Sequence, residues 1–166
     1  CVEEILPASS WHQLSRISVA IGPGGFTGTR LTVVMARTLA QQLNCPIDGI
    51  SSFALMAPRL SKSLQIEQSG KPFWIVQEIP RKGIIAGKYQ IKQSSKANNF
   101  EEALELERPK LLPPKYKVEP SVNAENNVAI DVIQLIKLSL LAKNLGHRSS
   151  WREVLPIYAT SPVENN

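Results

Sequence analysis

One segment of the sequence combines residue types and a spacing that could bind an anion. Three glycines fall within five positions from Gly22, and Thr27 adds a hydroxyl just before a predicted helix. Glycine allows positive φ and lets backbone N–H groups approach a ligand closely, and a helix N-terminus favours negative charge. A tight turn that packs a strand against a helix explains the same glycines equally well, so both interpretations stay open. The candidate residues are Gly22, Gly24, Gly25, Phe26, Thr27, Gly28 and Arg30.

The spacing of this loop departs from the two best-known nucleotide-binding motifs. A Walker A loop ends in Gly-Lys followed by Ser or Thr, and the segment has no such ending. A dinucleotide-binding GxGxxG loop needs a third glycine where Thr27 stands. The residues alone therefore do not name a nucleotide as the ligand.

The other chemistry-bearing residues form no catalytic or metal-binding pattern. His12 and His147 are isolated, and Cys1 and Cys45 share no CxxC motif. The pair Ser51-Ser52 precedes a predicted helix, where N-capping explains both hydroxyls. We therefore predict no catalytic residue, no metal site and no cofactor.

The composition is that of an ordinary globular protein. The 166 residues are 43% hydrophobic, and 19 Lys or Arg against 14 Asp or Glu give a net charge of +5. No apolar run approaches the roughly 18 residues that a membrane-spanning helix needs, and two cysteines cannot build a disulfide framework. We therefore expect a cytoplasmic protein with no membrane segment. The positive charges are scattered, so they permit RNA nearby but do not predict an autonomous RNA-binding module.

Alternating strands and helices are predicted on both sides of the glycine loop. The helix after the loop should be capped by Thr29, and its apolar residues recur every four positions. Its predicted buried face is Leu31, Met35, Leu39 and Leu43, widened by Val34. The predicted elements are the last turn of a helix at 1–6, a strand at 17–21, the loop at 22–28, a helix at 31–43, a strand at 47–50 and a helix from 53 to about 64.

The second half of the sequence predicts a hairpin, a proline-rich passage and a long helix. The glutamates between Glu101 and Glu107 are interpreted as the solvated face of a short helix. The long helix should bury the side that carries Val128, Val132, Leu135, Ile136, Leu140 and Leu141. The predicted elements are hairpin strands at 73–79 and 83–91, the short helix at 100–106, an extended passage at 109–120, the long helix at 128–145 and an edge strand at 155–158.

The segment Ile21–Arg30 resembles the GPGSFTGLR signature of the TsaB (YeaZ) family. The resemblance continues through Ala36–Ala40 and from Pro46 to Leu55, and it is weaker but in order as far as Pro162. In the weaker part, Arg81-Lys82-Gly83 stands at the family's hairpin, whose acidic residues are replaced by Ile79 and Ile84. Leu155-Pro156-Ile157-Tyr158 matches the family's closing Pro-x-Tyr, and Thr160 stands where the family often has arginine.

The resemblance implies the actin-like, sugar-kinase-like (ASKHA) ATPase superfold, with two α/β lobes and a cleft between them. Residues 1–68 would form the remainder of the first lobe with the glycine-rich loop, and residues 69–166 the second lobe. The family opens with a strand and an Asp-Thr-Ser turn that are not found here. We therefore expect a first lobe that is incomplete at the N-terminus, with an exposed sheet edge that favours association.

The resemblance also implies a function. Members are noncatalytic partners of a TsaD-like catalytic subunit and, with a TsaE-like ATPase, support formation of N6-threonylcarbamoyladenosine in tRNA. This chain would then not be an enzyme, would reach tRNA indirectly through the complex, and could form a homodimer in isolation. The alternative is an ATP-binding phosphotransferase-like or glycopeptidase-like enzyme of the same superfold. The partner interface implied by the family lies on the helix after the loop, at Leu31, Val33, Val34, Arg37 and Gln41.

Overall fold

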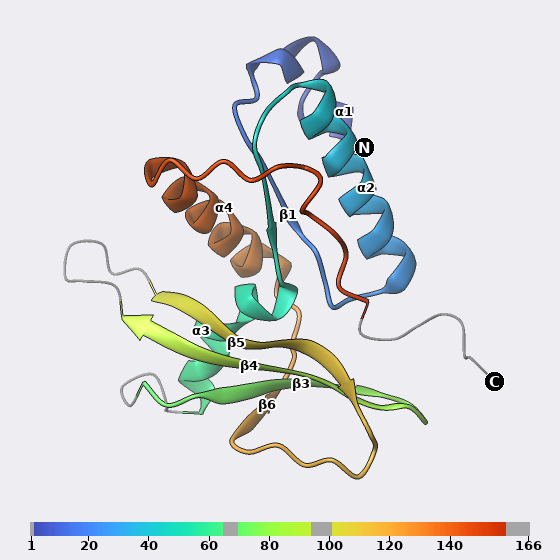
Figure 1. The fold of residues 1–166 in the computed structure, drawn as a ribbon, viewed down its shortest axis with the longest axis vertical. Coiled ribbons are helices and arrows are strands. Elements are labelled where there is room, and N and C mark those ends of the chain that lie inside the picture. The colour runs from blue at the N-terminus through green and yellow to red at the C-terminus, as the bar shows by residue number, and fades with distance from the viewer. Residues whose placement is uncertain (1, 65–69, 94–100, 159–166) are drawn as a thin grey trace.

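The structure, a computed structural model, describes residues 2–64, 70–93 and 101–158. Within these residues it is a mixed α/β fold with two sheets and flanking helices (Figure 1). The first elements are α1 (Val2–Ile5), the 3-10 helix η1 (Ala8–Gln13), β1 (Ile17–Ala20), α2 (Phe26–Gln42), β2 (Ile47–Ile50) and α3 (Ser52–Ser63). The later elements are β3 (Phe73–Ile79), β4 (Gly83–Gln93), β5 (Glu101–Leu112), β6 (Ser121–Asn123) and α4 (Val128–Asn144).

A short parallel sheet supports the glycine loop. β1 pairs with β2 in the register Ile17 to Ile47 and Ala20 to Ile50. α2 covers one face of this pair, where its small and β-branched residues form a buried cluster with Val19 and Ile47. α4 lies on the other side of the two strands (Figure 1), where Ser139 donates a hydrogen bond to Asp48 of β2. Both strands are thus enclosed between two helices, which explains the apolar residues of β1, whereas β2 carries the buried Asp48.

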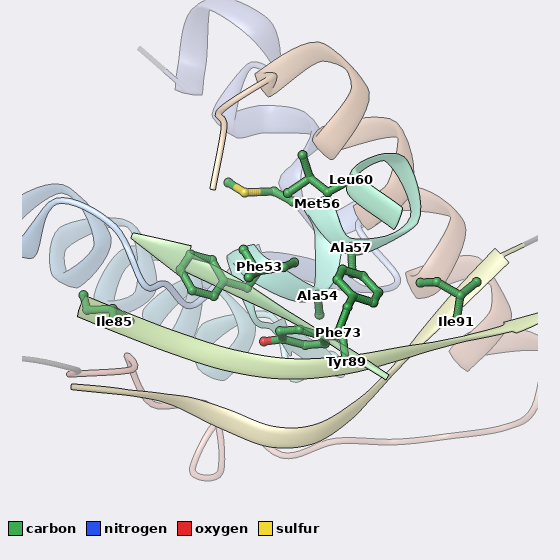
Figure 2. Close-up of a cluster of buried hydrophobic side chains, with 10 residues drawn as sticks. Phe53, Ala54, Met56, Ala57, Leu60, Phe73, Ile85, Tyr89 and Ile91 are labelled. Atoms are coloured by element: carbon green, nitrogen blue, oxygen red, sulfur yellow. The ribbon is translucent and has the colours of Figure 1, made fainter. Parts of the chain in front are cut away.

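The larger sheet has the strand order β5-β4-β3-β6 and is covered by α3. β3 and β4 form the predicted hairpin, and β6 runs parallel to β3. Phe53, Ala57 and Leu60 of α3 pack into the main core together with strand residues (Figure 2). The strand residues of that core are Phe73, Ile75, Ile85, Tyr89 and Ile91.

The short helix predicted around Glu101–Leu106 is wrong, because this segment is strand β5. β5 pairs antiparallel with β4 along most of its length. Glu105 and Glu107 turn toward the interior side and are half-buried, whereas Leu104 and Leu106 are exposed on the outer side. The sequence alternates Glu with Leu or Ala, which has the two-residue period of a strand, and pairing with β4 outweighs the helix propensity of glutamate. Phe100, the first residue of the predicted helix, lies outside the described residues.

The long helix was predicted correctly, but its predicted buried face is wrong. α4 ends at Asn144, and Gly146, the expected terminator, follows with φ +71°. Val128, Ile136 and Leu140 are more than half exposed, and no residue of α4 is fully buried. The inner face instead makes polar contacts: Asp131 pairs with Arg59, the Gln134 side chain donates to the carbonyl of Glu101, and Ser139 donates to Asp48. Leu135 and Leu141 of the predicted face are half-buried, so polar contacts and partly buried leucines together hold this helix.

The remaining predictions divide between confirmed elements and two errors. The strands at β1 and β2, the helix α3 and the β3–β4 hairpin are confirmed. The predicted edge strand at 155–158 is wrong: Ile157 donates one backbone hydrogen bond to Ile21, and Pro156 has no N–H to continue a ladder. β6 inside the proline-rich passage was not predicted. The expected lobe boundary at residues 68–69 and Thr160 both fall on or next to residues outside the described ranges.

Candidate functional site

The glycine loop connects β1 to α2 by a turn that requires glycine. Gly22 has φ +95°, and a Cβ there would lie 3.2 Å from the methyl group of Thr29. The carbonyl of Gly22 accepts a 2.7 Å hydrogen bond from the Ser52 N–H, which joins the loop to the start of α3. A Cβ on Gly24 would lie 3.0 Å from the Thr29 hydroxyl. These contacts support the close-packing interpretation for Gly22 and Gly24, and ligand binding by the loop stays a prediction.

The helix begins five residues earlier than predicted. Gly25 is the N-cap, so Phe26, Thr27 and Gly28 belong to the first turn of α2 and not to the loop. Thr29 is inside the helix and its N–H donates to the carbonyl of Gly25, so the predicted cap at Thr29 is wrong. Glycine is an accepted N-cap because it needs no particular side-chain geometry. No side chain caps this end of α2.

α2 places its large apolar side chains outward. Leu31 is 71% exposed, Val34 50% and Met35 44%, and we call these three residues the α2 patch. The buried face consists of Val33, Ala36 and Ala40. The predicted buried face is therefore wrong at Leu31, Val34 and Met35, whereas Leu39 and Leu43 are half-buried. The fully buried positions are small or β-branched residues, which let the helix approach the sheet closely.

The structure separates the five predicted interface residues. Leu31, Val34 and Gln41 are exposed, whereas Val33 is fully buried and cannot meet a partner. Arg37 is half-buried: its Nε donates to the carbonyl of Trp151 at 3.0 Å, and its guanidinium lies 5.7 Å from the centre of the Trp151 ring. Arg37 thus attaches α2 to the C-terminal segment.

An aromatic pair that the sequence reasoning did not combine lies at the N-terminal end of α2. Phe26 and Tyr158 have ring centres 5.7 Å apart, and the Arg30 guanidinium lies 5.9 Å from the Phe26 ring. Phe26 is 40% exposed and Tyr158 is 51% exposed. The two residues lie 132 positions apart, so their contact is made by the tertiary fold and no local sequence pattern predicts it.

A cleft of about 620 Å³ lies where the two sheets approach one another, and a chain of hydroxyl groups lies at its wall. The Tyr89 hydroxyl donates to Glu105 Oε2 at 3.0 Å, so Ser51, 3.2 Å away, is the donor to Tyr89. Burial raises the pKa of Tyr89 well above its ordinary value. Tyr89 is therefore a hydrogen-bond donor and not a base, and the Ser51 hydroxyl makes this contact instead of the predicted cap.

Metal ligation and thiol reactivity depend on how the His, Cys, Asp and Glu side chains are arranged. Within residues 2–64, 70–93 and 101–158, no three His, Cys, Asp or Glu side chains are grouped to hold a metal ion. Burial raises the pKa of the Cys45 thiol, which disfavours the nucleophilic thiolate.

Comparison with known proteins gives the family. A family model described as "TsaD: tRNA N6-adenosine threonylcarbamoyltransferase" matches residues 1–112, about two thirds of the chain. The chain belongs to this TsaD family. The tRNA threonylcarbamoyladenosine biosynthesis protein TsaB of Bacillus subtilis (strain 168) is 50% identical over 46 residues, 28% of this chain and 20% of that protein. The TsaD-family chain thus matches about a fifth of that relative's length.

Two solved structures are similar across nearly the whole TsaD-family chain. One is an uncharacterized Pseudomonas aeruginosa protein with similarity to peptidase YEAZ, at TM-score 0.67 and 21% identity, covering 96% of this chain and 81% of that one. The other is YeaZ from Pseudomonas aeruginosa, at TM-score 0.65 and 22% identity, covering 94% and 80%. These matches confirm the expected actin-like, sugar-kinase-like fold and, with the TsaB match, the TsaB (YeaZ) resemblance. None of the helices described is long and apolar enough to cross a membrane.

Proposed function

We propose that this chain is a noncatalytic partner subunit in the formation of N6-threonylcarbamoyladenosine in tRNA, and that it docks on a TsaD-like catalytic subunit. The family match and the TsaB relative support the biosynthetic role. The net charge of +5 favours approach to an assembly that handles tRNA. Contact with a TsaE-like ATPase and indirect contact with tRNA belong to the same proposal.

The observation that carries the docking proposal is the outward orientation of the α2 patch. A helix on the surface of a monomer normally buries its largest apolar residues, yet Leu31 is 71% exposed while Ala36 and Ala40 are buried. Exposed Met and aromatic side chains beside an arginine are typical of binding surfaces. The patch and the nearby Phe26, Arg30 and Tyr158 therefore offer a helix-sized apolar surface to a partner helix.

The noncatalytic part of the proposal rests on the chemistry of the cleft. The Ser51 hydroxyl has a neutral tyrosine as its neighbour, and Tyr89 in turn is held by Glu105. A serine nucleophile needs an adjacent base to take its proton, and a tyrosine with a raised pKa accepts no proton at neutral pH. These hydrogen bonds stabilise the fold, and they provide no base that would activate Ser51 in the enzyme alternative.

Copurification with the TsaD-like protein of the same organism tests the docking site. We expect a complex with the unmodified chain and at least about tenfold weaker binding for Leu31→Lys, because a charge would be buried in an apolar contact. Gln42→Lys is the matched control: it adds the same charge to an exposed residue at the C-terminal end of α2, eleven positions from Leu31. Its binding should be unchanged.

Two results would contradict the proposal. Absence of a complex with the unmodified chain contradicts the partner role. If Leu31→Lys binds the TsaD-like protein as tightly as the unmodified chain does, docking through α2 is contradicted. The partner role would still be supported by formation of the complex. Hydrolysis of ATP or a peptide by the purified chain would contradict the noncatalytic assignment.

A further inference from the structure

Two groups of basic residues that are separate in the sequence meet at one end of the larger sheet. The first lies in the turn of the β3–β4 hairpin, and the second runs from the end of β5 into the proline-rich passage. Ile84 of β4 pairs with Leu112 of β5, so the hairpin turn and the passage leave the sheet beside one another (Figure 1). The five basic residues, which we call the basic tip, are Arg81, Lys82, Lys110, Lys115 and Lys117.

The backbones of the two segments lie in close contact. Gly83 has φ +124°, and a Cβ there would lie 3.0 Å from the carbonyl carbon of Pro113 and 3.1 Å from the nitrogen of Pro114. The passage then turns at once, because the Tyr116 N–H donates to the carbonyl of Pro113 at 2.9 Å. Arg81 and Pro114 line the same hollow of about 220 Å³. The two basic segments therefore form one surface.

The basic tip concentrates positive charge that is scattered in the sequence. Residues 80–83 and 110–117 contain five Lys or Arg and no Asp or Glu, whereas the whole chain has a net charge of +5. Two acidic residues adjoin the tip: Glu107 pairs with Lys110 at 2.7 Å, and Glu78 lines the hollow. The local excess is therefore three positive charges, and all five basic residues are exposed. Such a concentration of one sign of charge attracts a polyanion.

An exposed aromatic ring lies among these charges. Tyr116 stands between Lys115 and Lys117 in the chain and is 55% exposed. It also lies near Lys110, because the pKa of Lys110 is raised chiefly by its hydrogen bond to Glu107 and to a smaller extent by Tyr116. An aromatic ring interleaved with lysines is typical of surfaces that bind single-stranded nucleic acid, since a base can stack on the ring while phosphates meet the lysines.

We propose that the basic tip binds RNA directly, with its arginine and lysines contacting backbone phosphates and Tyr116 stacking on an unpaired base. This direct contact rests on the proposed role in tRNA modification and adds to the indirect contact through the complex. An acidic protein segment would satisfy the charges but would offer the Tyr116 ring no flat partner, so RNA fits the surface better. The basic tip belongs to the larger sheet, whereas the α2 patch belongs to a helix on the smaller one.

Fluorescence anisotropy with a labelled, unmodified tRNA transcript tests the basic tip in the 166-residue chain. We expect a dissociation constant of about 1–100 μM that rises steeply with salt. The double variant Lys115→Gln, Lys117→Gln should bind at least about tenfold more weakly at about 50 mM salt, and its salt slope should be smaller by about 2, one for each lost phosphate contact. Lys137→Gln, Lys143→Gln is the matched control, because it removes the same charge from exposed positions of α4 and should leave binding nearly unchanged.

Two tyrosine variants distinguish base stacking from attraction by charge alone. Tyr116→Ala should weaken tRNA binding at least about fivefold, the lower end of what one stacked base contributes, and Tyr116→Phe should leave it unchanged. Equal tRNA affinities of the lysine double variant and its α4 control, or full affinity of Tyr116→Ala, overturn the proposal. Poly-glutamate that binds as tightly as tRNA also overturns it and assigns the basic tip to acidic protein segments.

Copurification with the TsaD-like protein keeps this test separate from the partner role. Lys115→Gln, Lys117→Gln should form the complex as the unmodified chain does, because both residues lie outside α2. A chain that forms the complex but binds no tRNA by itself contradicts the RNA contact alone. A chain that binds tRNA through the basic tip but forms no complex contradicts the partner role alone.

Discussion

The ion pair between Arg16 and Asp48 should make one of the larger single contributions to stability in this protein. Arg16 Nε lies 2.7 Å from Asp48 Oδ2 and its Nη2 lies 3.0 Å from Oδ1, so the contact is bidentate. The side chains are only 9% and 10% exposed. Arg16 also donates to the carbonyl of His147, and Ser139 donates to Asp48. The pair therefore joins β2 and the residue before β1 to Ser139 of α4 and to His147, just beyond the end of that helix.

Replacing Asp48 with alanine would leave the Arg16 guanidinium and the Ser139 hydroxyl without their carboxylate. Loss of one partner of a buried ion pair destabilises by about 3–5 kcal/mol. Since Arg16 keeps its bond to the carbonyl of His147 and the site lies near the surface, we expect the lower end, about 3 kcal/mol. That is a large fraction of the roughly 5–15 kcal/mol that holds a domain folded.

Urea unfolding followed by circular dichroism measures this loss. Lys110→Met is the control, because Lys110 pairs with Glu107 at 2.7 Å on the exposed surface, where ion pairs contribute little. The double variant Arg16→Met, Asp48→Leu should recover much of the loss, since it removes both charges together. If Asp48→Ala lowers the free energy of unfolding by less than about 1 kcal/mol, the claim that an unpaired buried charge dominates is refuted. It is also refuted if the double variant recovers none of the lost stability.

Three further substitutions test the core, the sheet contacts and the first turn of α2. Tyr89→Phe should lower the free energy of unfolding by about 1–2 kcal/mol, since Ser51 and Glu105 lose their shared partner; urea unfolding measures it. Because burial raises the pKa of Tyr89, the folded chain keeps a proton that the unfolded chain releases above about pH 10, so stability should fall as pH rises past that value. Gly49→Ala should destabilise by about 1–3 kcal/mol, because its Cβ would lie 2.8 Å from a Val154 methyl group. Gly28→Ala, whose Cβ meets nothing within 4 Å inside α2, should stabilise by about 0.5–1 kcal/mol in the same thermal or urea assay.

The elements around the loop were predictable because their signals are local. A β-branched apolar run gave β1, and turn residues bounded the β3–β4 hairpin, whose arms pair as expected. β5 was missed because the strand is defined by its pairing with β4, and a run of glutamates taken alone favours a helix. Local pattern thus predicts an element's existence better than its tertiary partner.

Which face of each helix is buried could not be predicted from the sequence, for a physical reason. The sequence pattern weights Leu and Met above Ala, yet in α2 the residues that touch the sheet are Val33, Ala36 and Ala40. In α4 two of the inward residues, Asp131 and Ser139, are polar, and their partners Arg59 and Asp48 lie 72 and 91 residues away in the chain, so no local pattern marks them as inward. A hydrophobic pattern cannot distinguish a face that meets its own core from one that meets another molecule.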